Sequence, residues 1–227
     1  MKLRWRRVVI SVLSLAALGY VIWQAAPTLE PGTQPAAPTI SNDTTALATL
    51  DSLAVKGRAP KTDYSREQFG NGWIKVNGCD TRNIILYRDL ENPVLDGECD
   101  VVSGTLNDPY TGETIHFQKS DGNMVQIDHV VALSDAWQKG AQLLSREIQV
   151  QLANDPLELL AVAGSANQQK GDADAASWLP KHKPFRCEYV ARQIAVKQKY
   201  DLWVTEAESN AMRDVLGRCP GQRLPAR

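Results

Sequence analysis

The sequence has few of the residues that most often build metal sites, and it has little net charge. It contains three histidines, and none of its four cysteines stands in a Cys-x-x-Cys spacing. A closed zinc site is therefore not expected. The formal net charge of the 227 residues is only −1, whereas proteins that coat nucleic acid are strongly basic. An enzyme that meets an anionic substrate through a metal and a few local cations remains allowed.

Long apolar runs are absent from most of the chain, and the one long apolar run without charge lies near the N-terminus. Four basic residues within residues 1–7 precede it, and it covers residues 8–23. Its length lies between a signal-peptide core of ~7–15 residues and a membrane span of ~17–25. We therefore predict that residues 1–24 are a signal peptide or a signal anchor. The positive end stays inside, so the body is expected outside the cytoplasm, secreted or tethered to the membrane.

Composition divides the remainder into three parts. Residues 25–60 are rich in Pro, Ala and Thr and lack sustained periodicity, so they are interpreted as a linker. One short helix is expected at the end of this linker, within residues 45–55. Residues 61–221 are expected to form a single domain, and residues 222–227 a C-terminal tail.

Four cysteines behind an export segment favour two disulfides. Three pairings are possible, and we favour Cys79–Cys99 and Cys187–Cys219, because each pair falls in one local segment. Four buried thiols are the alternative. Apolar residues recur at helical spacing after Cys187 and again before Cys219, so the second disulfide would join two helices.

The most informative stretch covers residues 126–174. Asp128 and His129 end an apolar run rich in β-branched residues, and a second apolar run follows at residues 157–162. Both runs have the length and composition of short strands. Side chains alternate along a strand, so a strand end or a bulge must re-aim Asp128 or His129 if both are to face one site.

A helix is expected directly after the second run. Ser165, followed three residues later by Gln168, forms the pattern of a capping box, so Asn167 and Lys170 would lie in the first two turns. The start of a capped helix presents free N–H groups to a phosphate, and Lys170 adds a full positive charge. The order strand, strand, helix would bring a carboxylate, an imidazole and a carboxamide to one metal.

These residue types suit hydrolysis of a phosphodiester, which needs a nucleophilic water, neutralised charge and a stabilised leaving oxygen. His129 can accept the proton from water, with an ordinary pKa of about 6.5. Asp128 and Asn167 offer hard oxygen ligands, which suit one divalent ion such as Mg²⁺ or Mn²⁺. We therefore expect a rise in activity as His129 deprotonates.

Several other polar residues have plainer interpretations. Arg82 is a second candidate for a phosphate contact, although a salt bridge to an acid such as Asp89 is favoured. His116 stands alone in a predicted strand and is expected to be structural. Asp172 and Asp174 are expected to be solvated acids of the helix rather than metal ligands.

The Asp-His pair, the second run and the Asn-x-x-Lys spacing together resemble the HNH endonucleases, whose fold is the ββα-metal finger. The resemblance implies that His129 is the general base, that Asp128 and Asn167 bind the metal, and that Lys170 lies near the phosphate. The family has an Asn at the middle of its pattern, which fixes the loop geometry. This chain has Glu158 there, and we expect Glu158 to support the finger instead.

A wider similarity covers the body of the chain. It is similar to exported bacterial HNH proteins related to the C-terminal domain of GmrSD-type restriction endonucleases. The similarity rests on the phrases CDTRN, QIDHVVALSDAW, NDPLELLAV, SANQQKGDADAASWLP and YVARQIAVKQKY. It implies an α+β fold in which the finger is embedded in a small mixed domain, with C-terminal helices and disulfides that staple it.

The resulting hypothesis is an exported, metal-dependent endonuclease that hydrolyses nucleic acid, with DNA favoured over RNA as the substrate. By resemblance, the products would carry 5′-phosphate and 3′-hydroxyl ends. The rival hypothesis is a non-catalytic extracytoplasmic binding module that retains the finger as a scaffold, and Glu158 is the residue that favours it. The sequence makes no prediction of oligomeric state.

Overall fold

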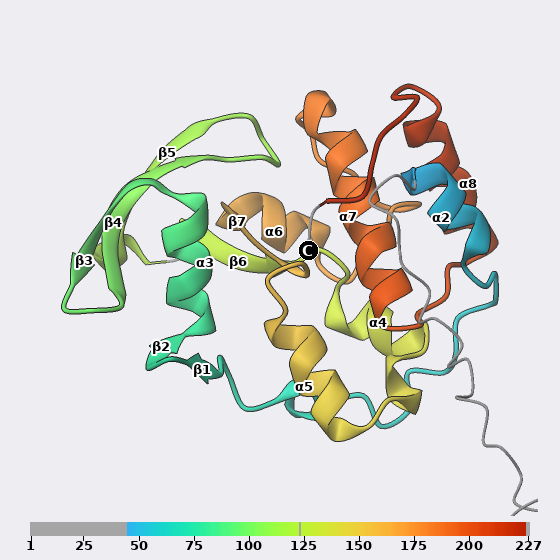
Figure 1. Cartoon of the computed structure of the whole chain (residues 1–227), viewed down its shortest axis with the longest axis horizontal. Helices are drawn as coiled ribbons and strands as arrows, with labels where there is room; N and C mark the ends of the chain where they lie inside the picture. Colours follow the sequence, from blue (N-terminus) through green and yellow to red (C-terminus); the bar gives the residue numbers. More distant parts are fainter. Residues whose placement is uncertain (1–44, 123, 226–227) are drawn as a thin grey trace, which may run out of the picture. The chain divides into compact units, whose positions relative to one another are not determined.

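The structure is a computed structural model that describes residues 45–122 and 124–225, within one compact unit that covers residues 41–227. The predicted signal segment and much of the predicted linker lie outside the described residues. Within the described part, no helix is long and apolar enough to cross a membrane. The architecture is α+β, as predicted, with small antiparallel sheets among short helices (Figure 1).

The elements are short throughout. The α-helices are α2 (Ala46–Ser52), α3 (Thr81–Asp89), α4 (Leu133–Gln138), α5 (Arg146–Asn154), α6 (Gly164–Lys170), α7 (Arg186–Lys199) and α8 (Glu206–Leu216). The strands are β1 (Lys75–Val76), β2 (Cys79–Asp80), β3 (Glu91–Asp96), β4 (Asp100–Asn107), β5 (Thr114–Gln118), β6 (Val125–His129) and β7 (Leu159–Ala163). Single 3-10 turns are η1 (Arg66–Phe69), η2 (Lys119–Asp121), η3 (Ala141–Leu143) and η4 (Lys183–Phe185).

The packed unit begins before residue 61. Helix α2 is the short helix expected near residues 45–55, and its Ala46 and Leu50, at i and i+4, are buried in the main core. Thr45 caps the helix and also pairs with Arg223 in an antiparallel bridge. Residues 45–60 therefore pack against the domain rather than forming a free linker, because the Ala- and Leu-rich helix has an apolar face to bury.

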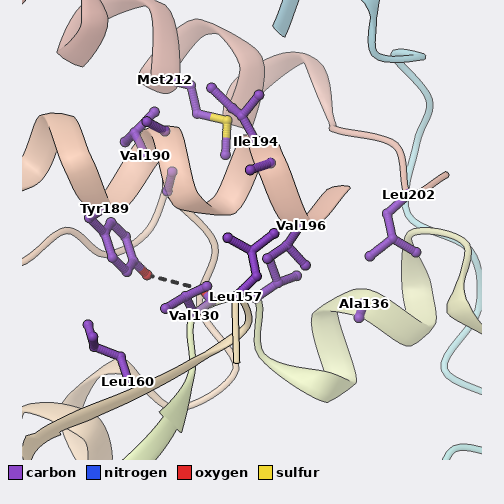
Figure 2. Packing of buried hydrophobic residues seen from close by; sticks show 14 of the residues in the cluster. Val130, Ala136, Leu157, Leu160, Tyr189, Val190, Ile194, Val196, Leu202 and Met212 are labelled. Atoms are coloured by element: carbon purple, nitrogen blue, oxygen red, sulfur yellow. Dashed lines mark hydrogen bonds between the residues drawn. The ribbon is translucent and has the colours of Figure 1, made fainter. Parts of the chain in front are cut away.

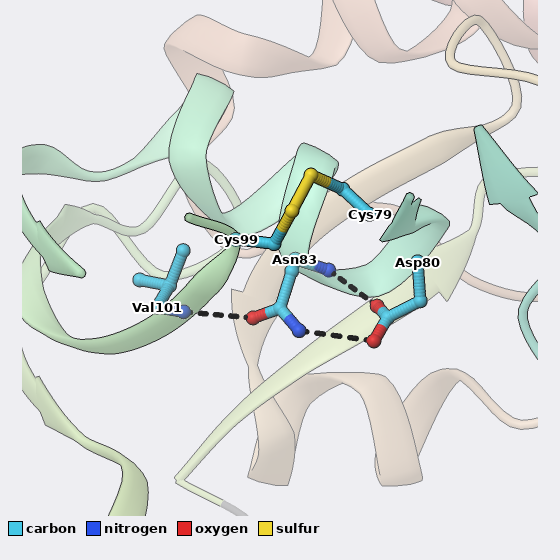
Figure 3. The surroundings of a disulfide bond; sticks show 5 residues. All are labelled: Cys79, Asp80, Asn83, Cys99 and Val101. Atoms are coloured by element: carbon cyan, nitrogen blue, oxygen red, sulfur yellow. Dashed lines mark hydrogen bonds between the residues drawn. A yellow bond between two sulfur atoms is a disulfide. The ribbon is translucent and has the colours of Figure 1, made fainter. Parts of the chain in front are cut away.

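Helix α3 and the sheet β3-β4-β5 form one side of the unit. Asp80 caps α3 by accepting from Asn83 N, and the Asn83 side chain bonds both Asp80 and Val101 N (Figure 3). The disulfide Cys79–Cys99 links the same two segments. A covalent bond and a hydrogen-bonded bridge therefore fix α3 against β4, and this is one of the two pairings favoured from the sequence.

The hairpin of β6 and β7 lies between two apolar clusters. Its antiparallel register is continuous from Val125↔Ala163 to His129↔Leu159. Alternate residues face opposite ways. One face joins the smaller cluster formed with α3, β4 and β5: Ile85, Leu86, Leu90, Val101, Leu106, Phe117, Val125, Ile127, Leu159 and Ala161. The other face contributes Leu160 and Val162 to the main core.

The main core packs α7 and α8 against the segments that flank the hairpin. Val130, which follows β6, and Leu157, which precedes β7, belong to the same buried cluster as Ile194 of α7 and Met212 of α8 (Figure 2). The apolar stripe predicted for α7 is buried, and a capping box at Thr205 opens α8. The second favoured disulfide, Cys187–Cys219, ties the start of α7 to the residues after α8.

A network of buried charges joins these helices. Lys139 Nζ lies 2.8 Å from Asp135 Oδ1, 2.8 Å from Asp174 Oδ2 and 2.6 Å from Glu208 Oε2. The full network balances three cations against three carboxylates: Arg58, Lys139 and Lys197 with Asp135, Asp174 and Glu208. Asp174 is buried here, so the expectation of a solvated acid was wrong for it, because Lys139 compensates its charge. Asp172 is exposed, as expected.

Candidate active site

The hairpin and α6 hold the four residues that the sequence pattern groups. Strand β6 supplies Asp128 and His129, and α6 supplies Asn167 and Lys170. The helix begins at Gly164, immediately after β7 ends at Ala163, with no side-chain cap. The expected capping box at Ser165 is therefore absent, because the strand runs directly into the helix. Ser165 is already helical and cannot adopt the extended backbone of a cap.

Asp128 is paired inside the protein. Lys170 Nζ lies 2.9 Å from Asp128 Oδ1 and donates to the carbonyl oxygen of His129, also at 2.9 Å. The hydroxyl of Tyr110 donates to Asp128 Oδ2. Lys170 is only 2% exposed. Its ammonium is thus the internal counter-ion of Asp128, and a contact with a substrate phosphate would require it to leave this pair.

Asn167 lies on the same side of the hairpin as Asp128. Its Nδ2 donates to Gln126 Oε1 at 2.9 Å, and Gln126 and Asp128 are alternate residues of β6. Both side chains therefore face α6. Asn167 is half-buried, and no hydrogen bond of its carboxamide oxygen is found among the described residues. The two proposed ligands thus share one face of the finger.

His129 faces the other way. Its Nε2 lies 3.0 Å from the carbonyl oxygen of Ala153, at the end of α5. Because a carbonyl only accepts, Nε2 carries the proton and Nδ1 keeps its lone pair. The ring stacks on Trp73, with centroids 5.8 Å apart and planes within 9°. The regular register of β6 and β7 contains no bulge that turns His129 towards Asp128.

The imidazole of His129 is held neutral. Burial, and then the positive charge of Arg66, lower the pKa of His129 to about 3. The expectation of an ordinary pKa near 6.5 was therefore wrong, because the ring is enclosed between Trp73 and Ala153 and lies near the positive charge of Arg66. A neutral imidazole is in the right state to accept a proton, although its basicity is reduced.

A small cavity of about 210 Å³ opens beside His129. Its lining includes Arg66, Phe69, Trp73 and Asn154 as well as His129 itself. Neither Arg66 nor Trp73 was predicted from the sequence to be a site residue. No local motif marks either residue, because they precede the hairpin by a long stretch of chain and reach His129 only through the tertiary fold.

Glu158 ties the hairpin together. It is fully buried, and its Oε2 accepts from Val131 N at 3.2 Å, while its backbone oxygen accepts from Val130 N at 2.9 Å. The residues that follow β6 are thereby hydrogen-bonded to Glu158, which precedes β7. These two bonds hold the ends of the two strands together. Burial raises the pKa of Glu158 well above its ordinary value.

Arg82 is not part of the cavity. It is half-buried on α3, and its Nη2 donates to the carbonyl oxygen of Val125 at 3.5 Å. The salt bridge favoured with Asp89 is absent, because the neighbouring Arg88 takes both oxygens of that carboxylate at 2.6 and 2.8 Å. Arg82 thus connects α3 to the first residue of β6, and its phosphate contact remains a prediction.

The donor set suits Mg²⁺ or Mn²⁺ better than zinc. Among residues 45–122 and 124–225, no group of three or more His, Cys, Asp or Glu side chains is placed to hold a metal. Mg²⁺, however, is commonly held by one or two carboxylates plus waters and substrate phosphates. Asp128 and Asn167 fit that pattern in their chemistry and in the face they share. A metal there would compete with the ammonium of Lys170 for Asp128.

Comparison with known proteins places this ββα arrangement in a family. Residues 81–215 match the model of the GmrSD restriction endonucleases, C-terminal domain. The match covers more than half of the chain, and the chain belongs to this family. The site therefore lies in a nuclease-related domain.

A fungal relative extends the match. A protein of Arthroderma benhamiae, described as an uncharacterized secreted protein, is 38% identical over 192 residues, which cover 83% of this chain and 92% of the relative. This relative gives no support for the bacterial grouping expected from the sequence. No solved structure was found to match.

Proposed function

We propose that the protein is an exported, metal-dependent HNH endonuclease that hydrolyses phosphodiester bonds of DNA. The observation that supports it best is the state of His129. Its Nε2–H is fixed by Ala153 O, its ring is stacked on Trp73, and it lines a cavity. A neutral imidazole with a committed Nε2 and an uncommitted Nδ1 is what a general base requires.

In this proposal each residue of the finger has a separate role. His129 removes the proton from the attacking water through Nδ1. Since Asp128 and Asn167 face the other side of β6, the end of this strand would have to turn for the base and the metal to meet at one phosphate. Asp128 and Asn167 hold one divalent ion, Mg²⁺ or Mn²⁺, which when bound would neutralise charge on the phosphate and the leaving oxygen. Glu158 keeps the turn after β6 in place through Val131 N. Lys170 holds the carboxylate of Asp128 in position before a metal arrives.

Three observations support export. The described chain has two disulfides, which persist in oxidising compartments. The relative from Arthroderma benhamiae is described as secreted. The N-terminal apolar run has the composition of a signal segment. We propose that the protein acts outside the cytoplasm, either secreted or tethered to the membrane by its N-terminal segment.

A second candidate function is a binding module without catalysis. The buried pairing of Asp128 with Lys170 and Tyr110 favours it, because this carboxylate already has partners for both oxygens. In that case the ββα unit would serve as a scaffold, and metal would change neither its stability nor its activity.

Cleavage of plasmid DNA distinguishes the two. The purified protein should nick DNA with Mg²⁺ or Mn²⁺ and fail to do so with EDTA. His129→Ala should lower the cleavage rate by ~10²–10⁴-fold while DNA binding persists, and His116→Ala and His182→Ala should retain most activity. DNA binding without cleavage under any metal, including Zn²⁺, would support the binding module. Parallel assays with RNA address the substrate.

A further inference from the structure

One wall of the His129 cavity lies outside the region that matches the family model. That region begins at residue 81, whereas the wall is built from the segment 66–73. We propose that this wall binds substrate, with Arg66 contacting a backbone phosphate of the nucleic acid. The inference rests on the proposed endonuclease function and names a substrate contact for it.

Arg66 has the features of a ligand-binding cation. It lines the cavity, its residue is exposed, and it has no ion pair or side-chain hydrogen bond within the described residues. Other arginines of the unit are committed: Arg58 pairs with Asp135 and Asp174, and Arg88 pairs with Asp89. The guanidinium of Arg66 therefore keeps its donors for a partner that enters the cavity.

The residues that follow Arg66 in the same turn fix its backbone against the core. Phe69, in the same 3-10 turn, is only 2% exposed and packs edge-on against Trp137, with ring centroids 6.3 Å apart. Gly70 follows with φ +105°, and a Cβ there would lie 3.5 Å from the side chain of Val150 on α5. The turn is thus anchored in the core, so Arg66 projects from a rigid base.

The far end of the wall is anchored too. Ile74 N donates to Asn154 Oδ1 at 3.0 Å, and Ile74 O accepts from Thr81. Trp73, held between these anchors, covers one face of the His129 ring. Trp73 therefore acts as a positioning residue for His129, while Arg66 stands at the rim of the same cavity.

The chemistry of the cavity fits a phosphate. A guanidinium binds phosphate oxygens through two parallel N–H donors. The volume of about 210 Å³ has room for one phosphate group with a few waters, each of which takes about 30 Å³ in the liquid. No acid lines this cavity among the described residues, so an anion meets no repulsion from its walls.

Binding of a short fluorescent DNA duplex in EDTA tests this contact without cleavage. Arg66→Gln should weaken binding about tenfold or more and reduce the slope of log K against log salt by ~1. Arg66→Lys should restore the slope but not the full affinity, because the fork of donors is lost. The matched control is Arg146→Gln, since Arg146 is exposed and bonds Gln68 but does not line the cavity.

The outcomes separate this inference from the proposed catalysis. Unchanged affinity and slope in Arg66→Gln would overturn it, and so would an equal loss in Arg146→Gln. Absence of binding to both DNA and a matched RNA strand would also overturn it. If His129→Ala cleaves as fast as wild type while Arg66→Gln loses the phosphate contact, the catalytic assignment fails and the Arg66 contact stands.

Discussion

At the scale of single residues, two acids near the hairpin have opposite surroundings. Asp128 has an ammonium and a hydroxyl as partners. Glu158 has only Val131 N for one oxygen, and among the described residues its Oε1 has no hydrogen-bond partner. Burial raises the pKa of Glu158 well above its usual value. Burial therefore favours the protonated form of Glu158 in the native state, and this couples folding to pH.

Glu158→Gln should show that coupling. Below the unfolded pKa, near 4.5, both states of the wild type hold the proton. Above it only the unfolded state releases the proton, so wild-type stability falls as pH rises towards the folded pKa. Gln does not ionise and still accepts from Val131 N. The advantage in Tm of Glu158→Gln over wild type should therefore grow as the pH rises above about 4.5 towards the raised folded pKa.

A control isolates the hydrogen bond from the charge. Glu158→Ala loses the contact to Val131 N and should be destabilised by roughly 1–3 kcal/mol in acid, where wild-type Glu158 is protonated in both states. A difference between Glu158→Gln and wild type that stays constant with pH would mean that Glu158 is ionised in the native state.

The residues of the candidate site could be predicted only in part. The pattern grouped Asp128, His129 and Asn167 because strand runs and an Asn-x-x-Lys spacing are local signals, and their roles stay predictions. The structure puts His129 on the opposite face of β6 from Asp128 and gives it Trp73 as a neighbour. That neighbour, and the burial that lowers the pKa of His129, depend on contacts between distant segments, which periodicity does not encode.

At the scale of elements, the buried charge network fixes how the helices meet. Asp135 lies on α4, Lys197 on α7 and Glu208 on α8, while Asp174 follows α6. Lys139 contacts three of the carboxylates at once. The segment that leaves α6 is thereby tied to the C-terminal helices, so the helix of the candidate site depends on a cluster that lies away from it.

Lys139→Met should lower the free energy of unfolding. It leaves two cations against three buried carboxylates, and breaking a buried ion pair from one side typically costs ~3–5 kcal/mol. Lys61→Met is the control, because Lys61 pairs with Asp172 at the surface and such pairs contribute little. Urea unfolding at neutral pH measures both. Equal midpoints for the two variants would rule out a structural role for the network.

Helices whose apolar residues recur at helical spacing could be predicted from the sequence, whereas α3 and the start of α6 could not. The apolar residues that recur at helical spacing after Cys187 and before Cys219 belong to α7 and α8, as expected from the sequence. The apolar residues 84–86 of α3 are too few for a period to distinguish helix from strand. Ser165 gave a false start for α6, because a capping pattern does not reveal that a strand ends immediately before it.

At the scale of the whole molecule, the disulfides close the unit at two places. Cys79–Cys99 spans a sequence separation of 20 and Cys187–Cys219 one of 32. Loops of these lengths correspond to about 3–4 kcal/mol each in the chain-entropy model. Together they make up a large share of the ~5–15 kcal/mol that stabilises a typical domain, so the fold is suited to an oxidising compartment.

Removal of the disulfides should therefore be costly. Cys187→Ser with Cys219→Ser should lower the free energy of unfolding by ~2–4 kcal/mol, measured by urea denaturation under oxidising conditions. The variant with both disulfides removed should be the least stable of the series. Protein from its native host should contain no free thiols. Four free thiols there, or no loss of stability on reduction, would contradict the extracytoplasmic assignment.

The bridge between Thr45 and Arg223 has a consequence for how the unit can be joined to other chains. Ala46 N also donates to Gln222 O at 2.8 Å, so the two ends of the packed unit leave it side by side. A domain whose two termini lie close together tolerates insertion into a loop of another protein. It also tolerates circular permutation, in which the termini are joined and the chain is cut in another loop. We therefore expect residues 45–223 to keep their fold when they are inserted into a loop of another protein.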